Sequence, residues 1–316
     1  MKMTMRSLLG LAVLLAFAAK AQSLNPANFQ IESFPVGNGP IGLVFDGANI
    51  WVTNSGDDTV TKLRARDGTN LGTFPAGNNP SWITFDGANI WVSNSTVDNG
   101  TVTKLRAIDG AVLGSFVVGS SPEGIAYDGA NIWVAIFFSD AVMKLRASDG
   151  QVLGVFSVGD APRGVLFDGT SIWVVASGDN SVVQLDPSDG SLLATVSVGG
   201  LPYGMGFDGT KVWVSNMFDD TVTAVFDHNP GVKHTVPVGN IPWGISFDGR
   251  HMWVSNNADD SVSILSAKNG AYLHTIHVER NPAAVCFDGI SIWVANLDSD
   301  TVSKISPPSP TNHRSN

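Results

Sequence analysis

The sequence predicts an all-β fold, a seven-bladed β-propeller of four-stranded antiparallel blades. One sequence motif, clearest as Phe-Asp-Gly-Ala-Asn-Ile-Trp-Val-Thr-Asn at residues 45–54, recurs seven times along the chain. Its tryptophans follow one another at intervals of 40 residues, with one interval of 42: Trp51, Trp91, Trp133, Trp173, Trp213, Trp253 and Trp293. A fixed period of about 40–45 residues is the length of one propeller blade. No segment after the N-terminal apolar run has helical periodicity, so the repeats are expected to consist of strands.

Each repeat divides into four strands separated by turn signals. In the first complete repeat the strand-like runs are residues 43–45, 50–54, 59–63 and 70–76. Asp46-Gly47 separates the first two runs, and Asp67-Gly68 separates the last two. Asp-Gly supplies the positive φ that tight hairpins need. Because the first Asp-Gly recurs in all seven repeats, every blade is expected to begin with the same hairpin.

Recurrent aromatic residues predict how the blades pack against one another. Besides the tryptophans, an aromatic residue ends the first strand of each repeat: Phe45, Phe85, Tyr127, Phe167, Phe207, Phe247 and Phe287. Each such side chain can bury roughly 150–250 Å². We therefore expect both sets to fill the spaces between neighbouring blades.

The two ends of the repeat array predict how the ring closes. The seventh repeat stops after its third strand, residues 301–305, whereas residues 31–37 carry a fourth-strand pattern with no blade of its own. If this N-terminal strand completes the last blade, no sheet is left unfinished. The propeller is therefore predicted to span residues 22–306, and the Pro-rich, polar residues 307–316 are predicted to form a disordered C-terminal tail.

The first 21 residues have the pattern of a secretory signal peptide. Lys2 and Arg6 precede an apolar run at residues 8–19, and Ala-Lys-Ala offers a cleavage site before Gln22. The run is short for a membrane span, which disfavours the alternative of a retained anchor helix. We expect an exported protein, periplasmic or extracellular, that does not insert into a membrane after cleavage.

The charge of the chain argues against nucleic acid as a partner. The formal net charge is −10, and it becomes −13 when Lys2, Arg6 and Lys20 leave with the signal peptide. Such a surface would repel a phosphate backbone. The single cysteine, Cys286, allows no intramolecular disulfide. One closed ring accounts for the whole repeat array, and we expect it to be a monomer.

The repeats resemble the YVTN family of β-propellers, which are relatives of the NHL-repeat propellers. The Tyr-Val-Thr-Asn of that family stands here as Trp51-Val52-Thr53-Asn54. The connecting Val-Gly-x-x-Pro-x-Gly also matches, as at residues 198–204. The resemblance covers essentially the whole mature chain and implies the fold. It implies little about activity, since propellers host many unrelated functions.

A more distant similarity is to the streptogramin (virginiamycin B) lyases, seven-bladed propellers that open a cyclic peptide antibiotic. This resemblance implies a histidine general base in a Pro-His-Gly type of motif and a divalent metal, such as magnesium or calcium. The corresponding three-residue segments, which we call triplets, begin with proline, as in Pro202-Tyr203-Gly204, and contain no histidine. Their middle residues are Ile41, Ser81, Glu123, Arg163, Tyr203, Trp243 and Ala283. The departure removes the group best suited to proton transfer near neutral pH.

The middle residue of that triplet predicts the position of a binding site. In a propeller, the loop from an outer strand to the next inner strand reaches the central channel, and the loop between the second and third strands opens on the same face. The triplet position differs in every repeat of a nearly constant scaffold, as a shaped binding surface would require. Drift at an exposed loop position is the alternative interpretation. The candidate ligand-binding residues are Glu123, Arg163, Tyr203 and Trp243, flanked by Phe137, Phe138, Met217 and Phe218.

These residue types suit a concave site for a polar and partly aromatic ligand. Glu123 and Arg163 would pair with each other or orient the ligand, while Tyr203 and Trp243 would stack on it. The sequence thus favours a non-enzymatic propeller that binds a small ligand, a peptide or a protein partner, with no cofactor, no metal ligand and no catalytic residue assigned. The alternatives are a metal-dependent lyase or hydrolase, streptogramin lyase-like or lactonase-like, and a structural surface or matrix protein.

Overall fold

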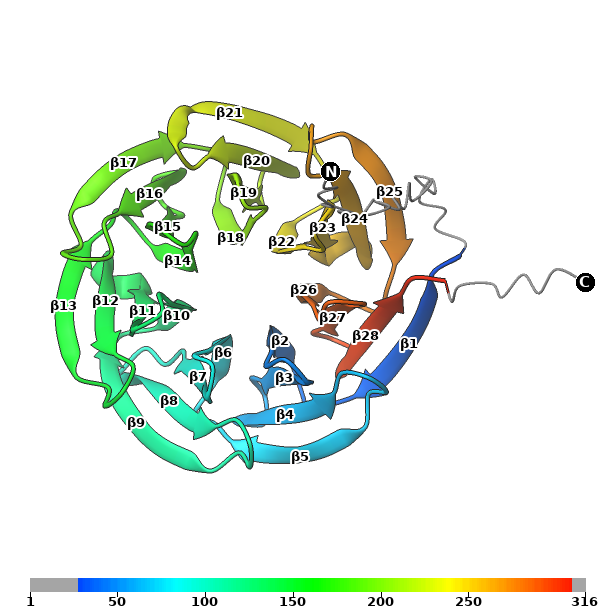
Figure 1. The fold of residues 1–316 in the computed structure, drawn as a ribbon, viewed down its shortest axis with the longest axis horizontal. Coiled ribbons are helices and arrows are strands. Elements are labelled where there is room, and N and C mark those ends of the chain that lie inside the picture. Colours follow the sequence, from blue (N-terminus) through cyan, green and yellow to red (C-terminus); the bar gives the residue numbers. More distant parts are fainter. Residues whose placement is uncertain (1–27, 309–316) are drawn as a thin grey trace, which may run out of the picture.

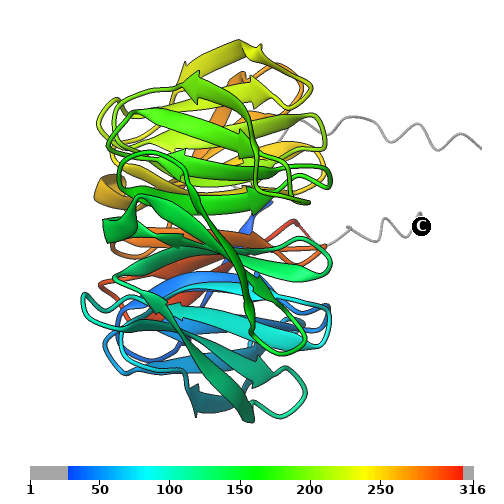
Figure 2. The ribbon, with the colours of Figure 1, turned by 90° about the vertical axis from the view of Figure 1, so that its left-hand side faces the viewer.

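The computed structural model describes residues 28–308, which close into a ring of seven four-stranded antiparallel blades. The inner strand of each blade faces the centre of the ring and the outer strand forms its perimeter (Figure 1). Seen from the side, the connections between strands lie on two opposite faces (Figure 2). The predicted fold class is confirmed. No helix within residues 28–308 is long and apolar enough to cross a membrane.

The blades follow the chain, each from its inner to its outer strand. The strands of blades 1 to 3 are β2 (Pro40–Phe45), β3 (Asn49–Asn54), β4 (Thr59–Arg64) and β5 (Asn70–Pro75); β6 (Pro80–Phe85), β7 (Asn89–Asn94), β8 (Gly100–Arg106) and β9 (Val112–Gly119); and β10 (Pro122–Tyr127), β11 (Asn131–Ile136), β12 (Ala141–Arg146) and β13 (Val152–Ser157). Those of blades 4 and 5 are β14 (Pro162–Phe167), β15 (Ile172–Ala176), β16 (Ser181–Leu185) and β17 (Leu192–Ser197); and β18 (Pro202–Phe207), β19 (Lys211–Asn216), β20 (Thr221–Phe226) and β21 (Asn229–Pro237).

Blade 6 contains β22 (Pro242–Phe247), β23 (His251–Asn256), β24 (Ser261–Ser266) and β25 (Tyr272–His277). Blade 7 combines β26 (Pro282–Phe287), β27 (Ile292–Asn296) and β28 (Thr301–Ser306) with the N-terminal β1 (Gln30–Pro35). Short 3-10 turns, η2 (Phe137–Ser139) and η3 (Asn257–Asp259), follow the second strands of blades 3 and 6. The predicted signal peptide and residues 309–316 of the predicted tail lie outside the described residues.

The inner strands begin three residues earlier than the sequence pattern indicated, at the proline of each triplet. A bulge lies between Pro40 and Leu43 in blade 1, and the same irregularity recurs in the other inner strands. Five of the seven triplets end in glycine, and there the neighbouring inner strands approach closely. A Cβ on Gly204 would lie 2.1 Å from the carbonyl oxygen of Trp243 in the next blade. The bulge and the glycine together fix the position of the triplet side chain.

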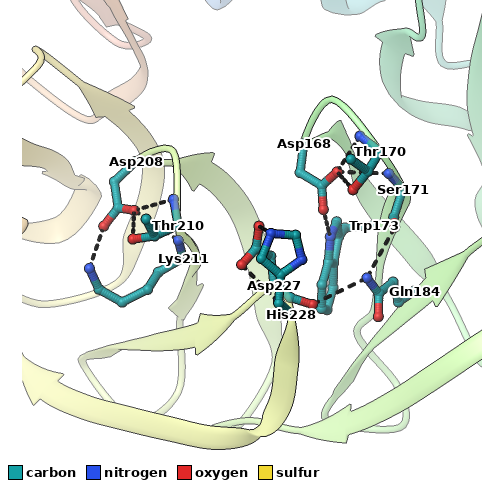
Figure 3. Close-up of polar contacts among 10 residues, drawn as sticks. All are labelled: Asp168, Thr170, Ser171, Trp173, Gln184, Asp208, Thr210, Lys211, Asp227 and His228. Atoms are coloured by element: carbon teal, nitrogen blue, oxygen red, sulfur yellow. Dashed lines mark hydrogen bonds and ion pairs between the residues drawn. The ribbon is translucent and has the colours of Figure 1, made fainter.

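A hydrogen bond joins the repeated aspartate and tryptophan in every blade. Trp173 Nε1 donates to Asp168 Oδ2 at 2.7 Å (Figure 3), and the other six pairs are 2.7–2.8 Å apart. The second oxygen of Asp168 accepts the backbone N–H groups of Thr170 and Ser171 and so closes the hairpin. All seven indoles are at most 2% exposed. The aspartate therefore both shapes the turn and satisfies a buried indole N–H.

Seven hydrophobic clusters hold the ring together, one at each seam between neighbouring blades. At the seam between blades 1 and 2, Trp51 packs with Ile83 and Leu105. The prediction that the tryptophans fill these spaces is confirmed. The aromatic residues that end the first strands are half-buried and pack against the same clusters, as Phe85 does at this seam, so the expectation holds for them too. An outer-strand phenylalanine also lies on the indole, as Phe74 does on Trp51 with ring centroids 5.6 Å apart.

Lysines on the third strands link each of four blades to the next. Lys62 Nζ lies 4.9 Å from the Trp51 ring centroid and donates to the carbonyl of Ala107 in blade 2 at 2.6 Å. The equivalent lysines are Lys104, Lys144 and Lys304. Blade 5 uses Lys211 of β19 instead, which pairs with Asp208 at 2.7 Å (Figure 3) and donates to the carbonyl of Ala267. These links add cation–π and hydrogen-bond energy to the apolar seams.

The N-terminal strand closes the ring as predicted. β1 pairs with β28 in an unbroken antiparallel register from Gln30↔Ser306 to Pro35↔Thr301. Phe34 lies on Trp293, with ring centroids 5.6 Å apart. At the same junction, Asp300 accepts the backbone N–H of Gly39 at 2.9 Å. The last blade therefore has an outer-strand phenylalanine on its indole, as blades 1 to 3 do.

The hairpin aspartates make the stability of the ring depend on pH. Burial raises the pKa of the Asp86 carboxyl, but hydrogen bonds from Trp91, Asn89 and two backbone N–H groups outweigh it and hold the pKa below its ordinary value. The same direction holds for Asp46, Asp128, Asp208 and Asp248.

A carboxyl with a lowered folded-state pKa stabilises the fold above its unfolded-state pKa of about 3.9, and this stabilisation is lost as the pH falls through the folded-state value. We expect the melting temperature to change little between pH 7 and pH 5 and to fall steadily below about pH 4. Thermal melts followed by circular dichroism at these pH values measure this. A melting temperature at pH 3 equal to that at pH 7 would contradict it.

Candidate functional site

The loops predicted to share one face of the ring do so. In every blade, the loop between the second and third strands donates a backbone N–H to the loop that enters the inner strand. Examples are Ser55 to Gly39 at 2.9 Å and Met217 to Leu201 at 3.1 Å. The triplets follow directly after these loops. We call this side of the ring the channel mouth.

A cavity of about 190 Å³ lies between the inner strands at the channel mouth. Trp82, Tyr203 and Trp243 line it together with Ile41 and Ala283. Its remaining wall is a belt of aliphatic side chains and one methionine, one from each blade: Leu43, Ile83, Ile125, Val165, Met205, Ile245 and Val285. The belt follows from the strand pattern, because each member stands two residues after the middle residue of a triplet.

Two of the predicted site residues stack on each other. The rings of Tyr203 and Trp243 are nearly parallel, with an interplanar angle of 17° and centroids 4.9 Å apart. Trp82 of blade 2 reaches Tyr203 of blade 5, with ring centroids 5.8 Å apart. Sequence reasoning did not select Trp82. The signal was its place in the triplet, where five repeats have glycine and one has alanine.

Arg163 lies between two aromatic rings beside this stack. Its Cζ is 4.6 Å from the Phe137 ring centroid and 5.0 Å from that of Tyr203. The guanidinium Nη1 is 3.9 Å from Glu123 Oε1, which also accepts a hydrogen bond from Ser95 at 3.3 Å. The structure thus brings Glu123, Arg163, Tyr203 and Phe137 into one contiguous group.

The carboxyl group of Glu123 has a raised pKa. Burial raises its pKa above the ordinary value, and this outweighs Arg163, Ser95 and the nearby Trp82 indole, all of which lower it. Burial also raises the pKa of the Tyr203 hydroxyl, and the Glu123 charge acts in the same direction. Tyr203 is therefore a neutral hydrogen-bonding group at physiological pH.

Three N–H donors in this group have no acceptor. Trp82 Nε1, Trp243 Nε1 and Arg163 Nε are buried without a hydrogen-bond partner. Trp82 Nε1 is near the Glu123 carboxylate without being in hydrogen-bonding geometry with it. Buried donors are normally paired, and each one left unpaired costs about 1–3 kcal/mol. All three belong to the group of side chains that surrounds Tyr203.

The remaining predicted residues lie farther out. Phe138 packs edge-on against Phe137 and is 61% exposed, and Phe218 is 77% exposed at the tip of its loop. Met217 is half-buried in the same loop. Of the eight candidates, only Tyr203 and Trp243 line the cavity itself. The structure therefore groups five of the eight candidates (the four triplet residues and Phe137) and leaves the other three around the rim.

The donor set at the channel mouth does not fit the divalent metal that the streptogramin lyase resemblance implied. Within residues 28–308, no three His, Cys, Asp or Glu side chains lie together as metal ligands. Glu123 is the only acidic residue among the triplets. The paired aspartates of the loops instead accept hydrogen bonds from the backbone. Asp57 accepts the N–H of Asn38 at 2.6 Å, and Asp58 accepts the N–H of Asn79 at 2.8 Å.

Net negative charge is concentrated on the face that carries the channel mouth, because its acidic residues have few basic neighbours. The loops of that face contain thirteen acidic residues, and Arg280 is the only basic one in them. The acidic residues are Asp57, Asp58, Asp98, Asp140, Asp160, Asp179, Asp219, Asp220, Asp259, Asp260, Glu279, Asp298 and Asp300. Exposed basic residues gather at the opposite end of the blades, among them Arg66, Arg106, Arg146, Arg250 and Lys268. A ligand approaching the mouth therefore meets a negative potential.

Comparisons with known proteins bear on the fold. No protein-family profile and no curated protein sequence matches the chain. Among solved structures, a streptogramin B lyase superposes with a TM-score of 0.77 at 18% identity, covering 90% of this chain and 100% of the lyase. The hydrazine synthase of Kuenenia stuttgartiensis superposes with a TM-score of 0.74 at 19% identity, covering 85% of this chain and 95% of that one. The expected distant likeness to streptogramin lyases holds, as a likeness of fold.

Proposed function

We propose that this protein is an exported, non-enzymatic propeller that binds a ligand at the channel mouth. The ligand class expected from the sequence is a small molecule, a peptide or a segment of a protein partner. The observation that carries the proposal is the stacked pair of Tyr203 and Trp243, which lines the cavity of about 190 Å³ together with Trp82. A flat or apolar ligand would gain contact area against these rings.

The surrounding residues support selective binding. Tyr203 and Trp243 form a flat aromatic surface, and Phe137 holds Arg163 against the other end of the stack. Rigid aromatic walls with a few directed polar groups are typical of small-molecule sites. Tyr203 and Trp243 belong to none of the seven seam clusters. Their side chains can therefore serve binding without carrying the main packing of the ring.

The test is a ligand screen of the mature protein by saturation-transfer NMR, with aromatic carbonyl compounds, short peptides and cyclic depsipeptides as probes. We expect the double variant Tyr203→Ala/Trp243→Ala to lose at least ~30-fold in affinity for any compound found, because it removes the stacking surface. Tyr272→Ala, on the exposed outer strand of blade 6, is the matched aromatic control and should bind as the unchanged protein does. A compound that binds the double variant with full affinity would show that the site is elsewhere.

A lyase or hydrolase is the second candidate. The fold likeness to a streptogramin B lyase favours it, and Glu123 is a buried carboxyl with a raised pKa, a property of general acids and bases. In the same screen, turnover of a cyclic depsipeptide or lactone that Glu123→Gln abolishes would replace the binding proposal with the enzymatic one. A structural matrix protein would instead show self-association and bind none of the probes.

A further inference from the structure

We infer that the cavity at the channel mouth takes a small, uncharged, apolar aromatic molecule. This inference rests on the binding function proposed above and names the class of its ligand. Three features of the site lead to it: the size and lining of the cavity, the internal pairing of the polar groups that border it, and the charge of the surrounding face.

The cavity has room for one aromatic ring with a short apolar substituent. Its volume is about 190 Å³, and an apolar protein cavity of about 150 Å³ is known to admit benzene. The lining consists of aliphatic side chains, Met205, the rings of Trp82, Tyr203 and Trp243, and glycines and alanines of the inner strands. A flat hydrocarbon would gain contact with these groups without needing a hydrogen bond.

Backbone polar groups beside the cavity already have partners within the protein. In blade 5, Gly204 donates its N–H to Ser215 Oγ at 2.9 Å, and this hydroxyl donates to the carbonyl of Trp243 at 2.7 Å. Two more lining glycines are joined to the next blade through a second-strand hydroxyl in the same way: Gly42 through Thr53 to Ser81, and Gly244 through Ser255 to Ala283. These bridges satisfy backbone groups that would otherwise attract a polar ligand.

The polar atoms of the three aromatic side chains do not serve a ligand either. The indole N–H groups of Trp82 and Trp243 are buried and have almost no accessible surface. Trp82 Nε1 lies near Glu123, outside the lining of the cavity. The Tyr203 hydroxyl lies near Arg163, which is also outside the lining. A ligand therefore meets mainly the carbon surface of these rings.

The charges around the site favour a neutral ligand over either kind of ion. The thirteen acidic residues of this face oppose the approach of an anion. A cation would be attracted to the face, but it would lose its hydration inside an uncharged lining. Arg163 already places a positive charge 5.0 Å from the Tyr203 ring centroid, so a second cation on this stack would be repelled.

Four probes of similar size test the inference: toluene, phenol, in which a hydroxyl replaces the methyl group, benzoate, the anion, and benzylammonium, the cation. Dissociation constants for the mature protein are measured at pH 7 by titration calorimetry. We expect toluene to bind at least ~10-fold more tightly than phenol, because the hydroxyl would be buried without a partner. Neither ion should show saturable binding.

A variant that fills the cavity locates the binding. Ile41 lines the cavity at the triplet position that holds Trp243 in blade 6, so the backbone there accepts a tryptophan. Ile41→Trp should therefore fold and lose at least ~10-fold in affinity for toluene, because the added ring takes up the space of the ligand. Leu192→Trp adds the same ring on the exposed outer strand of blade 4 and should bind toluene as the unchanged protein does.

The outcomes separate this inference from the binding function itself. Phenol binding as tightly as toluene, either ion binding as tightly as toluene, or no saturable binding of toluene would overturn the ligand class. So would an Ile41→Trp protein, folded by its thermal melt, with full affinity for toluene. If Ile41→Trp does not fold, Ile41→Phe replaces it with the same expectation. The wider screen with Tyr203→Ala/Trp243→Ala decides separately whether the mouth binds a ligand of any other class.

Discussion

Deletion of residues 28–35, which removes β1, should lower the melting temperature of the ring by at least ~12 °C. Blade 7 would lose its outer strand, and β28 would become an exposed edge. Phe34 would leave Trp293, and Phe29 would leave Trp253, where the rings now meet edge-on with centroids 5.7 Å apart. Losing two such aromatic contacts costs roughly 6 kcal/mol or more, and about 2 °C is lost per kcal/mol in a domain of this size.

Phe29 gives this deletion a second effect, at the seam between blades 6 and 7. Blade 6 has Ile264 where blade 1 has Lys62, so this seam lacks the lysine link. Phe29 packs into the seam cluster that contains Ile264 and Trp253. The single variant Phe29→Ala should therefore produce a measurable part of the loss, while Glu32→Ala, on the exposed face of β1, should melt like the unchanged protein. Scanning calorimetry measures all three variants; a deletion variant with an unshifted, single transition would refute the closure.

The fold was predictable because its determinants are local and repeated. The spacing of Asp46 and Trp51 within one hairpin fixes both the turn and the buried indole, and seven copies fix the number of blades. The lysine links were not predictable in the same way. Lys62 is an ordinary strand residue in the sequence, and its acceptor on Ala107 is 45 residues away in the next blade. Only the distance between neighbouring blades in the closed ring reveals the pair.

The sequence predicted where the candidate site lies, but not how its side chains pack against one another. The middle residue of each triplet was expected at the channel because the loop before it runs from an outer strand to the next inner strand. Whether Tyr203 and Trp243 contact a ligand or each other depends on rotamers and on the width of the ring, which the repeat does not encode. Trp82 and Tyr203 illustrate this, since blades 2 and 5 are far apart in sequence and meet only across the channel. Variation among repeats located the site, and side-chain packing determined its shape.

Trp213→Ala should destabilise the protein by about 3–5 kcal/mol, which corresponds to a fall in melting temperature of roughly 6–10 °C. Trp213 is fully buried in the cluster between blades 5 and 6, beside Met252 and Val254. Truncation would leave a cavity in a seam that neighbouring strands, pinned by their own hydrogen bonds, cannot close. It would also remove the 2.8 Å hydrogen bond to Asp208 and the ring beneath Lys211.

Two further variants separate the cavity from the hydrogen bond. Trp213→Phe keeps much of the apolar volume but leaves Asp208 without its indole donor, so it should cost about 1–3 kcal/mol. Trp243→Ala removes an indole of the same size from the channel, outside every seam cluster, and should lower the melting temperature by less than Trp213→Ala does. Chemical denaturation at pH 7 gives the three free energies of unfolding. If Trp243→Ala proved as costly as Trp213→Ala, the indoles at the seams would have no special role in holding the ring, and the channel stack would have to be regarded as part of the core.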